Sequence, residues 1–373
     1  MHYILKTSAI LIIAVTFSCC NNNFNWQGEI RNINQVKFIN NQDIPFKGFK
    51  EYVLKEVLSI GTTKVDSNYT FSRIVDLDVD KKGNIYILDY GYKHIQKYDR
   101  MGKYLLTIKP EVDFKDPVAI ELDSQGNLIV VDEGNLWCQI FTPLGKFKRQ
   151  FRIQGTFFTD LLIDSKDNII IADTYIALEE STRGTKFQLY DRNGNFLLTI
   201  CDKHISDEIQ KGMLNRFGGT INGSNNLYVA NLVSSSNYQI EIYDLAGKFL
   251  SRINRTVSRI PYTLEEKEKW IERKRRIFGE PRMKALFQIF QPPEYKPLIL
   301  GLFIINDNTL WVKTSEKKEN DTTVFDEFDN KGRFIRKIIV RGAELHRPLF
   351  LKNRIYDFAA PFEEIQCVRV YER

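Results

Sequence analysis

KGNIYILDYGYKHIQKYDRMGKYLLTI, residues 82–108, reads as three short β-strands separated by two turns. NIYIL is apolar and rich in β-formers, whereas HIQKYD and KYLLTI alternate between apolar and polar residues. The turn DRMG offers an aspartate at its start and a glycine where φ must be positive. A further strand, IVDLDVD (74–80), precedes the stretch, so the complete unit has four strands.

The same unit recurs along the rest of the chain. The copies are SQGNLIVVDEGNLWCQIFTPLGKFKRQF (124–151), SKDNIIIAD (165–173) with TKFQLYDRNGNFLLTI (185–200), SNNLYVANLVSSSNYQIEIYDLAGKFLSRI (224–253), DNTLWVKTSEKKENDTTVFDEFDNKGRFIRKI (307–338) and KNRIYDFAAPFEEIQCVRVYER (352–373). Six units of four strands predict an all-β fold, a six-bladed β-propeller with four-stranded blades.

The two ends of the repeat region complement each other. The sixth unit stops at Arg373 without a fourth strand. Near the N-terminus, KEVLSI (55–60) matches the fourth strands KYLLTI (103–108) and RFIRKI (333–338), yet no first three strands precede it. We therefore expect this N-terminal strand to complete the last blade and close the ring, which removes exposed sheet edges.

The first residues look like an export signal. SAILIIAVTF (8–17) follows Lys6 and is apolar, but its length suits a signal peptide better than a membrane span. TFSC resembles the lipobox of bacterial lipoproteins, with Cys19 as the acylated residue. The alternative is an ordinary signal peptide with incidental cysteines. Lipidation would anchor the exported protein in the bacterial cell envelope, in the periplasm or on the outer surface.

This gives three predicted segments. They are a lipoprotein signal peptide (1–18), a tether and N-terminal leader (19–50), and the propeller (51–373) with an insertion at 254–296.

Composition fits one large packed domain. The chain has 373 residues, of which 43% are hydrophobic and 13% aromatic. The net charge is +6, and residues 255–284 alone hold ten Lys/Arg against five Glu. The remainder is close to neutral, which argues against general nucleic-acid binding. Cys138, Cys201 and Cys367 form neither a disulfide framework nor a metal motif, so we expect buried thiols and no cofactor.

GNIYILD, HIQKYD and KYLLTI resemble NHL repeats, and more closely those of uncharacterised six-bladed propeller lipoproteins of bacteria. The resemblance covers roughly 51–373, and the run from Trp26 to Ile60 is similar to the leader of that family. It implies fold and export but no activity. Some NHL-type propellers are lyases that hold a metal on channel histidines. Here only His94, His204 and His346 follow the signal peptide, and their spacing around the ring argues against convergence.

Two sets of polar residues recur in the units. The first set, expected to start hairpin turns rather than to ligate calcium, comprises Asp80, Asp123, Asp164, Asn222 and Asn306. The second set ends the second strands and is expected to tie loops to backbone amides, with a functional ring of carboxylates as the alternative. It comprises Asp89, Asp132, Asp173 and Asn231, with Thr314 and Ala359 in the last two blades.

Topology places the second-to-third-strand loops and the inter-blade connections on one face of the disc. Propellers often bind ligands on this face, an argument by analogy of fold. The aromatic and charged candidates there are Arg73, Tyr90, Tyr92, Lys93, His94, Glu133, Trp137, Tyr175 and Arg216. They suit a recognition surface, and equally ordinary blade packing with a solvated edge.

The insertions are also expected on this face. Thr263 and Glu266 form a capping box before a helix over 264–278, and a second helix is expected over 281–290. A dense basic patch on the first helix would be either a solvated face or a dock for an acidic partner, anionic glycan or lipid headgroup. Its residues are Arg273, Lys274, Arg275 and Arg276. Residues 177–185 read as a mobile polar loop and 201–215 as a short helix.

No catalytic signature appears, whether GxSxG, HExxH or a phosphate-binding glycine loop. The leading interpretation is a monomeric, lipid-anchored platform that binds a protein or glycan without catalysis. A metal-dependent lyase or hydrolase using channel residues is one alternative, and a structural envelope protein is another. A glycosidase-like carboxylate pair also stays open, because it depends on a separation that sequence does not measure.

Overall fold

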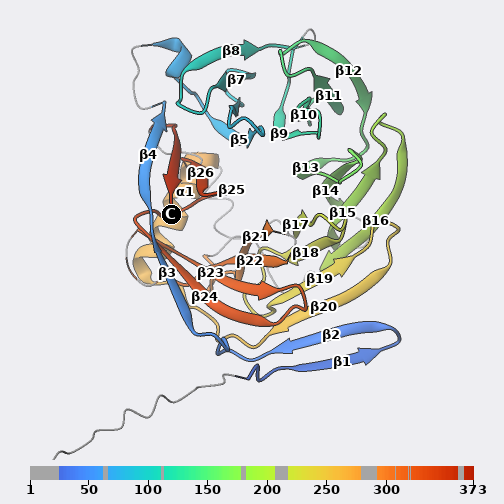
Figure 1. Ribbon diagram of the computed structural model, residues 1–373, viewed down its shortest axis with the longest axis vertical. Coiled ribbons are helices and arrows are strands. Elements are labelled where there is room, and N and C mark those ends of the chain that lie inside the picture. Colours follow the sequence, from blue (N-terminus) through green and yellow to red (C-terminus); the bar gives the residue numbers. More distant parts are fainter. Residues whose placement is uncertain are drawn as a thin grey trace, which may run out of the picture.

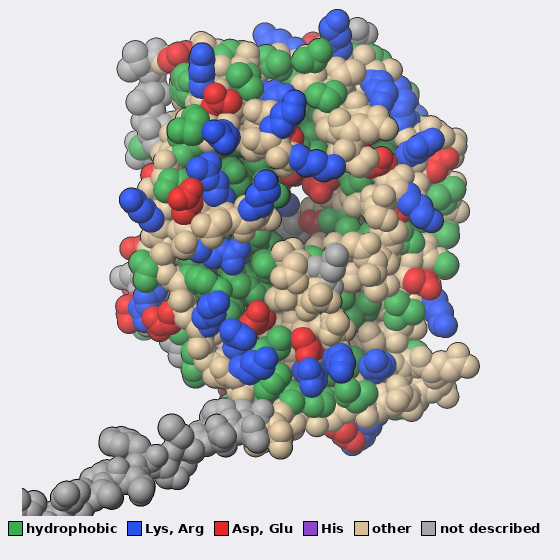
Figure 2. All heavy atoms as spheres, viewed as in Figure 1, with side chains coloured by type: hydrophobic (Ala, Val, Ile, Leu, Met, Phe, Trp, Pro, Cys, Tyr) green, Lys and Arg blue, Asp and Glu red, His purple; other side chains and the backbone are tan. Residues whose placement is uncertain are grey.

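Six twisted sheets form a ring in the computed structural model (Figure 1), and the space-filling view shows a channel opening at its centre (Figure 2). This confirms the predicted six-bladed propeller. Within the described ranges, no helix is long and apolar enough to cross a bilayer. The structure describes residues 25–61, 66–110, 113–177, 182–205, 217–278, 292–306, 308–317, 319, 321–359 and 365–373.

Blades 1 to 3 are antiparallel four-stranded sheets built from consecutive strands. Blade 1 consists of β5 (Ile74–Val79), β6 (Ile85–Asp89), β7 (His94–Tyr98) and β8 (Tyr104–Ile108). Blade 2 consists of β9 (Pro117–Leu122), β10 (Leu128–Asp132), β11 (Trp137–Phe141) and β12 (Phe147–Arg152). Blade 3 consists of β13 (Phe157–Ile163), β14 (Ile169–Ala177), β15 (Thr182–Tyr190) and β16 (Phe196–Ile205).

Blades 4 to 6 follow the same plan with additions from the N-terminus. Blade 4 consists of β17 (Phe217–Ile221), β18 (Leu227–Asn231), β19 (Gln239–Tyr243) and β20 (Phe249–Arg255). Blade 5 consists of β21 (Ile299–Asn306), β22 (Thr309–Thr314), β23 (Thr322–Asp329) and β24 (Phe334–Arg341). Blade 6 consists of β25 (Leu349–Leu351), β26 (Arg354–Phe358), β27 (Val368–Glu372) and the N-terminal β4 (Lys55–Ile60).

The ring closes as the repeat pattern predicted. Strand β4 pairs antiparallel with β27, with Val368 opposite Ile60 and Glu372 opposite Lys55. One blade therefore joins the two ends of the propeller, and the last sheet has no missing strand.

The leader forms an N-terminal belt, residues 29–60, around the outside of the ring. Strands β1 (Glu29–Ile33) and β2 (Val36–Asn41) make a hairpin, and β2 adds in parallel to β20 of blade 4. Strand β3 (Phe49–Val53) then adds in parallel to β24 of blade 5. The sequence predicts a tether and leader over 19–50 and does not predict that this segment extends two blades.

Buried polar contacts fix the belt to the blades. The Asn41 amide nitrogen donates to the carbonyl oxygens of Asn254 (3.1 Å) and Gly332 (3.0 Å). Arg255 is fully buried and pairs with Asp326 of blade 5 (2.6 Å) and with Asp43 of the belt (2.8 Å). Arg255 therefore links the belt to blade 5 through two ion pairs, and the pair with Asp326 is fully buried.

Apolar clusters fill the spaces between neighbouring blades. One cluster joins Tyr86 and Leu88 of blade 1 to Ile120 and Phe141 of blade 2. Cys138, Cys201 and Cys367 are buried thiols, as predicted. The core is therefore distributed around the ring, with one layer of packing between each pair of sheets.

Turn chemistry is also confirmed. The Asp80 carboxylate accepts hydrogen bonds from the backbone amides of Lys82 and Asn84, both at 2.9 Å. In the turn between the third and fourth strands of blade 1, Gly102 has a φ of 80°, which glycine adopts without strain. Equivalent side-chain to backbone contacts occur at Asp123, Asp164, Asn222 and Asn306.

The predicted helix α1 (Leu264–Phe278) is present, and Thr263 and Glu266 exchange the two bonds of a capping box, at 3.0 and 3.2 Å. The second predicted helix lies outside the described residues. The interpretation of 177–185 as a loop and of 201–215 as a helix is wrong for the residues that the structure describes. There β14, β15 and β16 extend the sheet of blade 3, with Tyr175 opposite Gly184 and Gly184 opposite His204, because the backbone ladder continues through these residues.

Candidate functional site

The disc has two chemically different faces. Second-to-third-strand loops and inter-blade connections form what we call the upper face. First-to-second and third-to-fourth-strand turns form the lower face. Helix α1 belongs to an inter-blade connection, and it lies behind the disc in Figure 1.

Buried carboxylates hold the loops of the upper face. Asp89 is fully buried and accepts hydrogen bonds from the backbone amides of Ser72 (2.7 Å), Arg73 (3.1 Å), Gly91 (2.8 Å) and Tyr92 (3.0 Å). Asp132, Asp173 and Asn231 make corresponding contacts in blades 2 to 4. The predicted loop-tying role is confirmed for all four residues.

Blade 6 departs from this alignment. Sequence comparison assigned Ala359 to the position, but the carboxylate comes from Asp357, two residues earlier. It accepts from the backbone amides of His346 (2.7 Å) and Arg347 (2.8 Å), and burial raises its pKa to about 6. In blade 5, the Thr314 hydroxyl accepts a longer bond from the Glu316 amide, at 3.4 Å.

The candidate residues of blade 1 contact one another. The Arg73 guanidinium lies 3.6 Å from the centre of the Tyr90 ring, and the Tyr90 hydroxyl donates to Asp116 (2.6 Å). That hydrogen bond raises the pKa of Tyr90. Tyr92 stacks on His94, whose pKa is lowered by burial. These side chains therefore contact one another, although the buried Arg73 Nε and His94 Nε2 atoms have no hydrogen-bond partner in the described part of the chain.

The candidate residues of blades 2 and 3 also contact neighbouring side chains or backbone amides. Glu133 accepts from the Phe158 amide (2.9 Å), and the Trp137 ring lies 4.3 Å from the Arg152 guanidinium. The Tyr175 hydroxyl donates to Asp202 (2.7 Å) and lies 2.9 Å from His204. The upper-face candidates thus form separate clusters, one to a blade, rather than one shared site. Arg216 and Cys19 lie outside the described residues.

The four residues of the basic patch on α1 differ in their exposure to solvent. Arg273, Arg275 and Arg276 are exposed, and Arg276 pairs with Glu272 (2.5 Å). Lys274 is half-buried with its ammonium group 5.4 Å from the Trp270 ring, and burial lowers its pKa. Partner binding at this patch stays a prediction.

Acidic side chains line the inner strands of the ring. Asp76 and Asp78 of β5 accept from the backbone amides of Ile120 (2.9 Å) and Leu122 (2.7 Å) of β9. Asp160 of β13 does the same for Gly219 of β17, at 3.2 Å. The innermost strand of each blade has an unpaired edge, and these carboxylates satisfy amides that the ladder leaves free.

These carboxylates make the channel acidic. Burial raises the pKa of Asp78 to about 7, and it raises those of Asp76 and Glu121 as well. Arg347 opposes the effect on Asp76 and donates to the Val75 carbonyl (3.2 Å). Asp and Glu side chains are visible inside the mouth of the channel in Figure 2.

The three histidines lie in different surroundings. His94 stacks on Tyr92, His204 lies beside Tyr175, and the His346 ring packs edge-on against Phe358. Among the residues that the structure describes, no three His, Cys, Asp or Glu side chains group in a way that could hold a metal ion.

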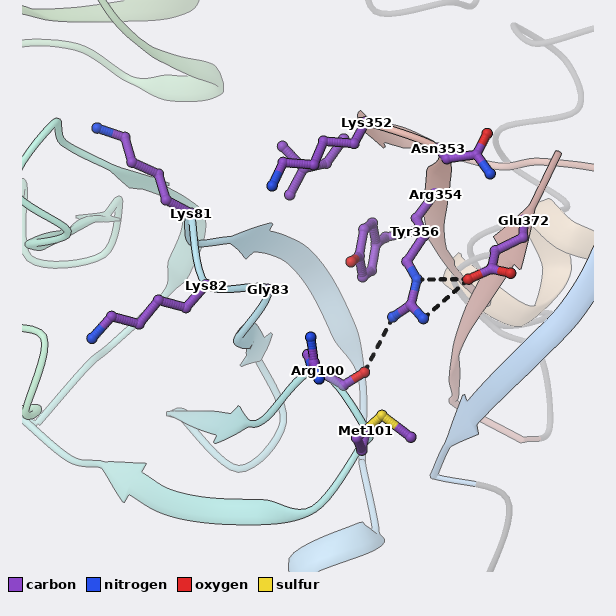
Figure 3. Close-up of a pocket in the computed structure, with 11 residues that line it drawn as sticks. Lys81, Lys82, Gly83, Arg100, Met101, Lys352, Asn353, Arg354, Tyr356 and Glu372 are labelled. Carbon is purple, nitrogen blue, oxygen red and sulfur yellow. Dashed lines mark hydrogen bonds and ion pairs between the residues drawn. The ribbon is translucent and has the colours of Figure 1, made fainter.

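A pocket lies on the lower face, at the seam where blade 6 meets blade 1 (Figure 3). Its volume is about 460 Å³, and three turns from distant parts of the chain border it. None of the candidates from the sequence lines it. The lining residues are Lys81, Lys82, Gly83, Arg100, Met101, Leu351, Lys352, Asn353, Arg354, Tyr356 and Glu372.

This seam pocket is strongly basic. Five of its side chains are cationic, and the one carboxylate, Glu372, is held by Arg354 at 3.0 Å. Arg354 also donates to the Arg100 carbonyl (3.2 Å), across the seam. Lys and Arg side chains gather on the face shown in Figure 2 where blades 6 and 1 meet. Lys82, Arg100 and Lys352 are exposed around the hollow without a carboxylate in its lining to neutralise them.

No family model matches the chain, and no curated protein matches it. A presumed exported protein from Bacteroides fragilis has a similar structure, with a TM-score of 0.52 at 9% identity over 90% of this chain and 99% of that chain. A protein of unknown function from Bacteroides caccae gives a TM-score of 0.43 at 12% identity, over 71% of this chain and 81% of that chain. At 9% identity, the first likeness concerns the fold alone.

Proposed function

We propose that this chain is an exported, lipid-anchored propeller of the NHL-like type that binds an acidic glycan in the seam pocket and performs no catalysis. The observation that carries the proposal is the charge of the pocket. Five cations surround a hollow whose single carboxylate is already paired. An anionic group entering the hollow would relieve the mutual repulsion of these cations.

The size and lining of the pocket favour a small cyclic group. A volume of about 460 Å³ lies within the range of ordinary small-ligand sites. Leu351, Met101 and the Tyr356 ring supply apolar surface, whereas Lys82, Arg100 and Lys352 supply donors. A sugar ring that carries a carboxylate or a sulfate group combines the two properties. A flat protein surface would not fill the hollow.

Binding at the seam would also stabilise the ring. Blade 1 provides one wall, and blade 6, which combines the N-terminal β4 with C-terminal strands, provides the other. A ligand that contacts both walls binds the closed ring better than the open one. It therefore raises the melting temperature as its concentration increases.

The test compares polygalacturonate, a sulfated glycan and neutral dextran by calorimetry and thermal shift. We expect the acidic glycans, but not dextran, to bind and to raise Tm. The double variant Lys82→Glu/Lys352→Glu should bind at least tenfold more weakly. A matched control, Lys146→Glu/Lys148→Glu, changes exposed lysines of blade 2 and should bind normally. Equal loss in both variants, or no binding of either acidic glycan, would overturn the proposal.

Anchoring is tested separately. Mass spectrometry of the protein extracted from cell envelopes should show an acylated Cys19 at its N-terminus, and Cys19→Ala should release the protein from the membrane fraction. Recovery of an unmodified chain that begins elsewhere would reject the anchor without affecting the pocket.

A further inference from the structure

The N-terminal belt carries an excess of exposed apolar side chains. Sixteen large hydrophobic residues are exposed in the described structure, and six of them lie in this one segment. Ile44 is 82% exposed and Val53 is 71% exposed, although the rest of the ring buries residues of these types in its core. The six residues are Ile30, Ile33, Ile44, Phe49, Val53 and Val57.

These side chains lie on the outer rim of the disc. Strand β1 is the outermost strand of blade 4, β3 of blade 5 and β4 of blade 6. In Figure 1 the blue strands of the belt run along the outside of the ring. The first described residue, Asn25, is next to Trp26, whose indole nitrogen donates to Asn41 (2.9 Å). The chain therefore enters the propeller at this rim and not at either face.

The charges of the belt are arranged asymmetrically. Its acidic side chains pair with arginines, as Glu29 does with Arg31 (2.6 Å) and Glu51 with Arg341 (3.0 Å). The other two acidic pairs are Asp43 with Arg255 and Glu56 with Arg369. Four exposed lysines have no carboxylate within ion-pair distance in the described part of the chain. They are Lys37, Lys47, Lys50 and Lys55.

We propose that this rim rests on the surface of the membrane that holds the protein, with the apolar side chains on the outer edges of blades 4 and 5 among the lipid headgroups and the lysines of the same edges facing anionic phosphates. The inference rests on the proposed anchor at Cys19. Asn25 is the sixth residue after Cys19, and an extended chain of that length spans only about 20 Å. The anchor thus keeps the rim close to the bilayer, where apolar and cationic side chains both bind favourably.

The inference fixes an orientation. A disc that contacts the membrane by its edge holds both faces away from the lipid surface. The seam pocket and the upper face then open sideways into the surrounding solution, and a glycan has access to the pocket. A second copy of the chain is the competing occupant, because β1 presents an unpaired strand edge.

The test uses the chain from Cys19 onward, which retains every described residue, with Cys20→Ser. Cys19 is coupled to a maleimide lipid in vesicles of phosphatidylethanolamine and phosphatidylglycerol. The three other thiols are buried and should not react. A photo-crosslinking amino acid is placed at Ile33 or Phe49, and at Leu105 or Leu144 as exposed controls on blades 1 and 2.

We expect crosslinks to lipid at Ile33 and Phe49 at least fivefold more often than at the controls. Equal yields at all four positions would overturn the inference. Crosslinks between two protein chains at Ile33 would also overturn it, in favour of the second copy. Because coupling to the vesicle is chemical, the outcome does not depend on whether cells acylate Cys19. Failure of the anchor is therefore distinguishable from failure of the rim contact.

Discussion

The upper and lower faces of the disc contain similar residues but differ in how these are neutralised. On the upper face Arg73 stacks on Tyr90, which donates to Asp116, and Trp137 meets Arg152. On the lower face the cations of the seam pocket share one paired carboxylate. A surface rich in aromatic and charged residues is therefore not in itself a binding site. We propose that the charges without partners mark the site.

The largest expected effect concerns the carboxylates that build the upper face. Asp132→Ala removes a fully buried group that accepts from the amides of Lys115 and Asp116, which should lower the free energy of unfolding by about 2–4 kcal/mol. Asp123→Ala, on the more exposed lower turn of the same blade, should cost about 1 kcal/mol. Urea denaturation measures both. Similar losses would mean that the two faces do not differ in this respect.

The second prediction uses the salt dependence of glycan binding to distinguish the two faces. Acidic glycan binding to the seam pocket should weaken at least tenfold, or about 1.4 kcal/mol, between low and high salt, because exposed charges are screened. Arg152→Ala, which removes the cation beside Trp137 on the upper face, should retain the wild-type affinity and the same salt dependence. Calorimetry over a salt series provides the measurement. A loss of affinity in Arg152→Ala would move the site to the upper face.

A smaller effect concerns pH and the acidic channel beside the pocket. The pKa of Asp78 in the folded protein, about 7, lies above its ordinary value of 3.8, so the folded state binds this proton more tightly than the unfolded state. The contribution of Asp78 to the free energy of unfolding has its full value below pH 4, and it is lost as the pH rises towards 7. We expect Tm to be higher at pH 5.5 than at pH 8, by a few degrees. Asp78→Asn should reduce the difference, and an unchanged slope in that variant would assign it to other groups.

The smallest effect belongs to one upper-face contact. Tyr90→Phe removes the hydroxyl that donates to Asp116 and retains the ring under Arg73, so it should destabilise the protein by about 1 kcal/mol. Glycan binding should stay at the wild-type level in the same protein preparation. Weaker glycan binding without a stability loss would show that this side chain recognises the ligand and does not merely pack the blade.

Much of the fold could be predicted from the sequence, because it depends on contacts between residues close together in the chain. Asp80 with Asn84 and the DxxG turns mark hairpins, because short polar side chains and glycine satisfy tight turns within a few residues. The loop-tying role of Asp89 follows from the same kind of contact. The missing fourth strand of the last unit and the surplus strand at 55–60 together predicted closure. Each of these inferences needs only a repeat and its neighbours.

The candidate site could not be read in this way. Lys82 and Lys352 meet only because closure brings the first and last blades together, and no local pattern measures that separation. The loop-tying carboxylate of blade 6 comes from Asp357 and not from position 359, since the path of the backbone decides which side chain reaches the loop amides. The belt, too, depends on strand edges supplied by β20 and β24. The repeated blade and its turns follow from the residues alone, because their stabilising contacts are local. Which charges lie together unpaired depends on how the ring closes, and no local pattern contains that information.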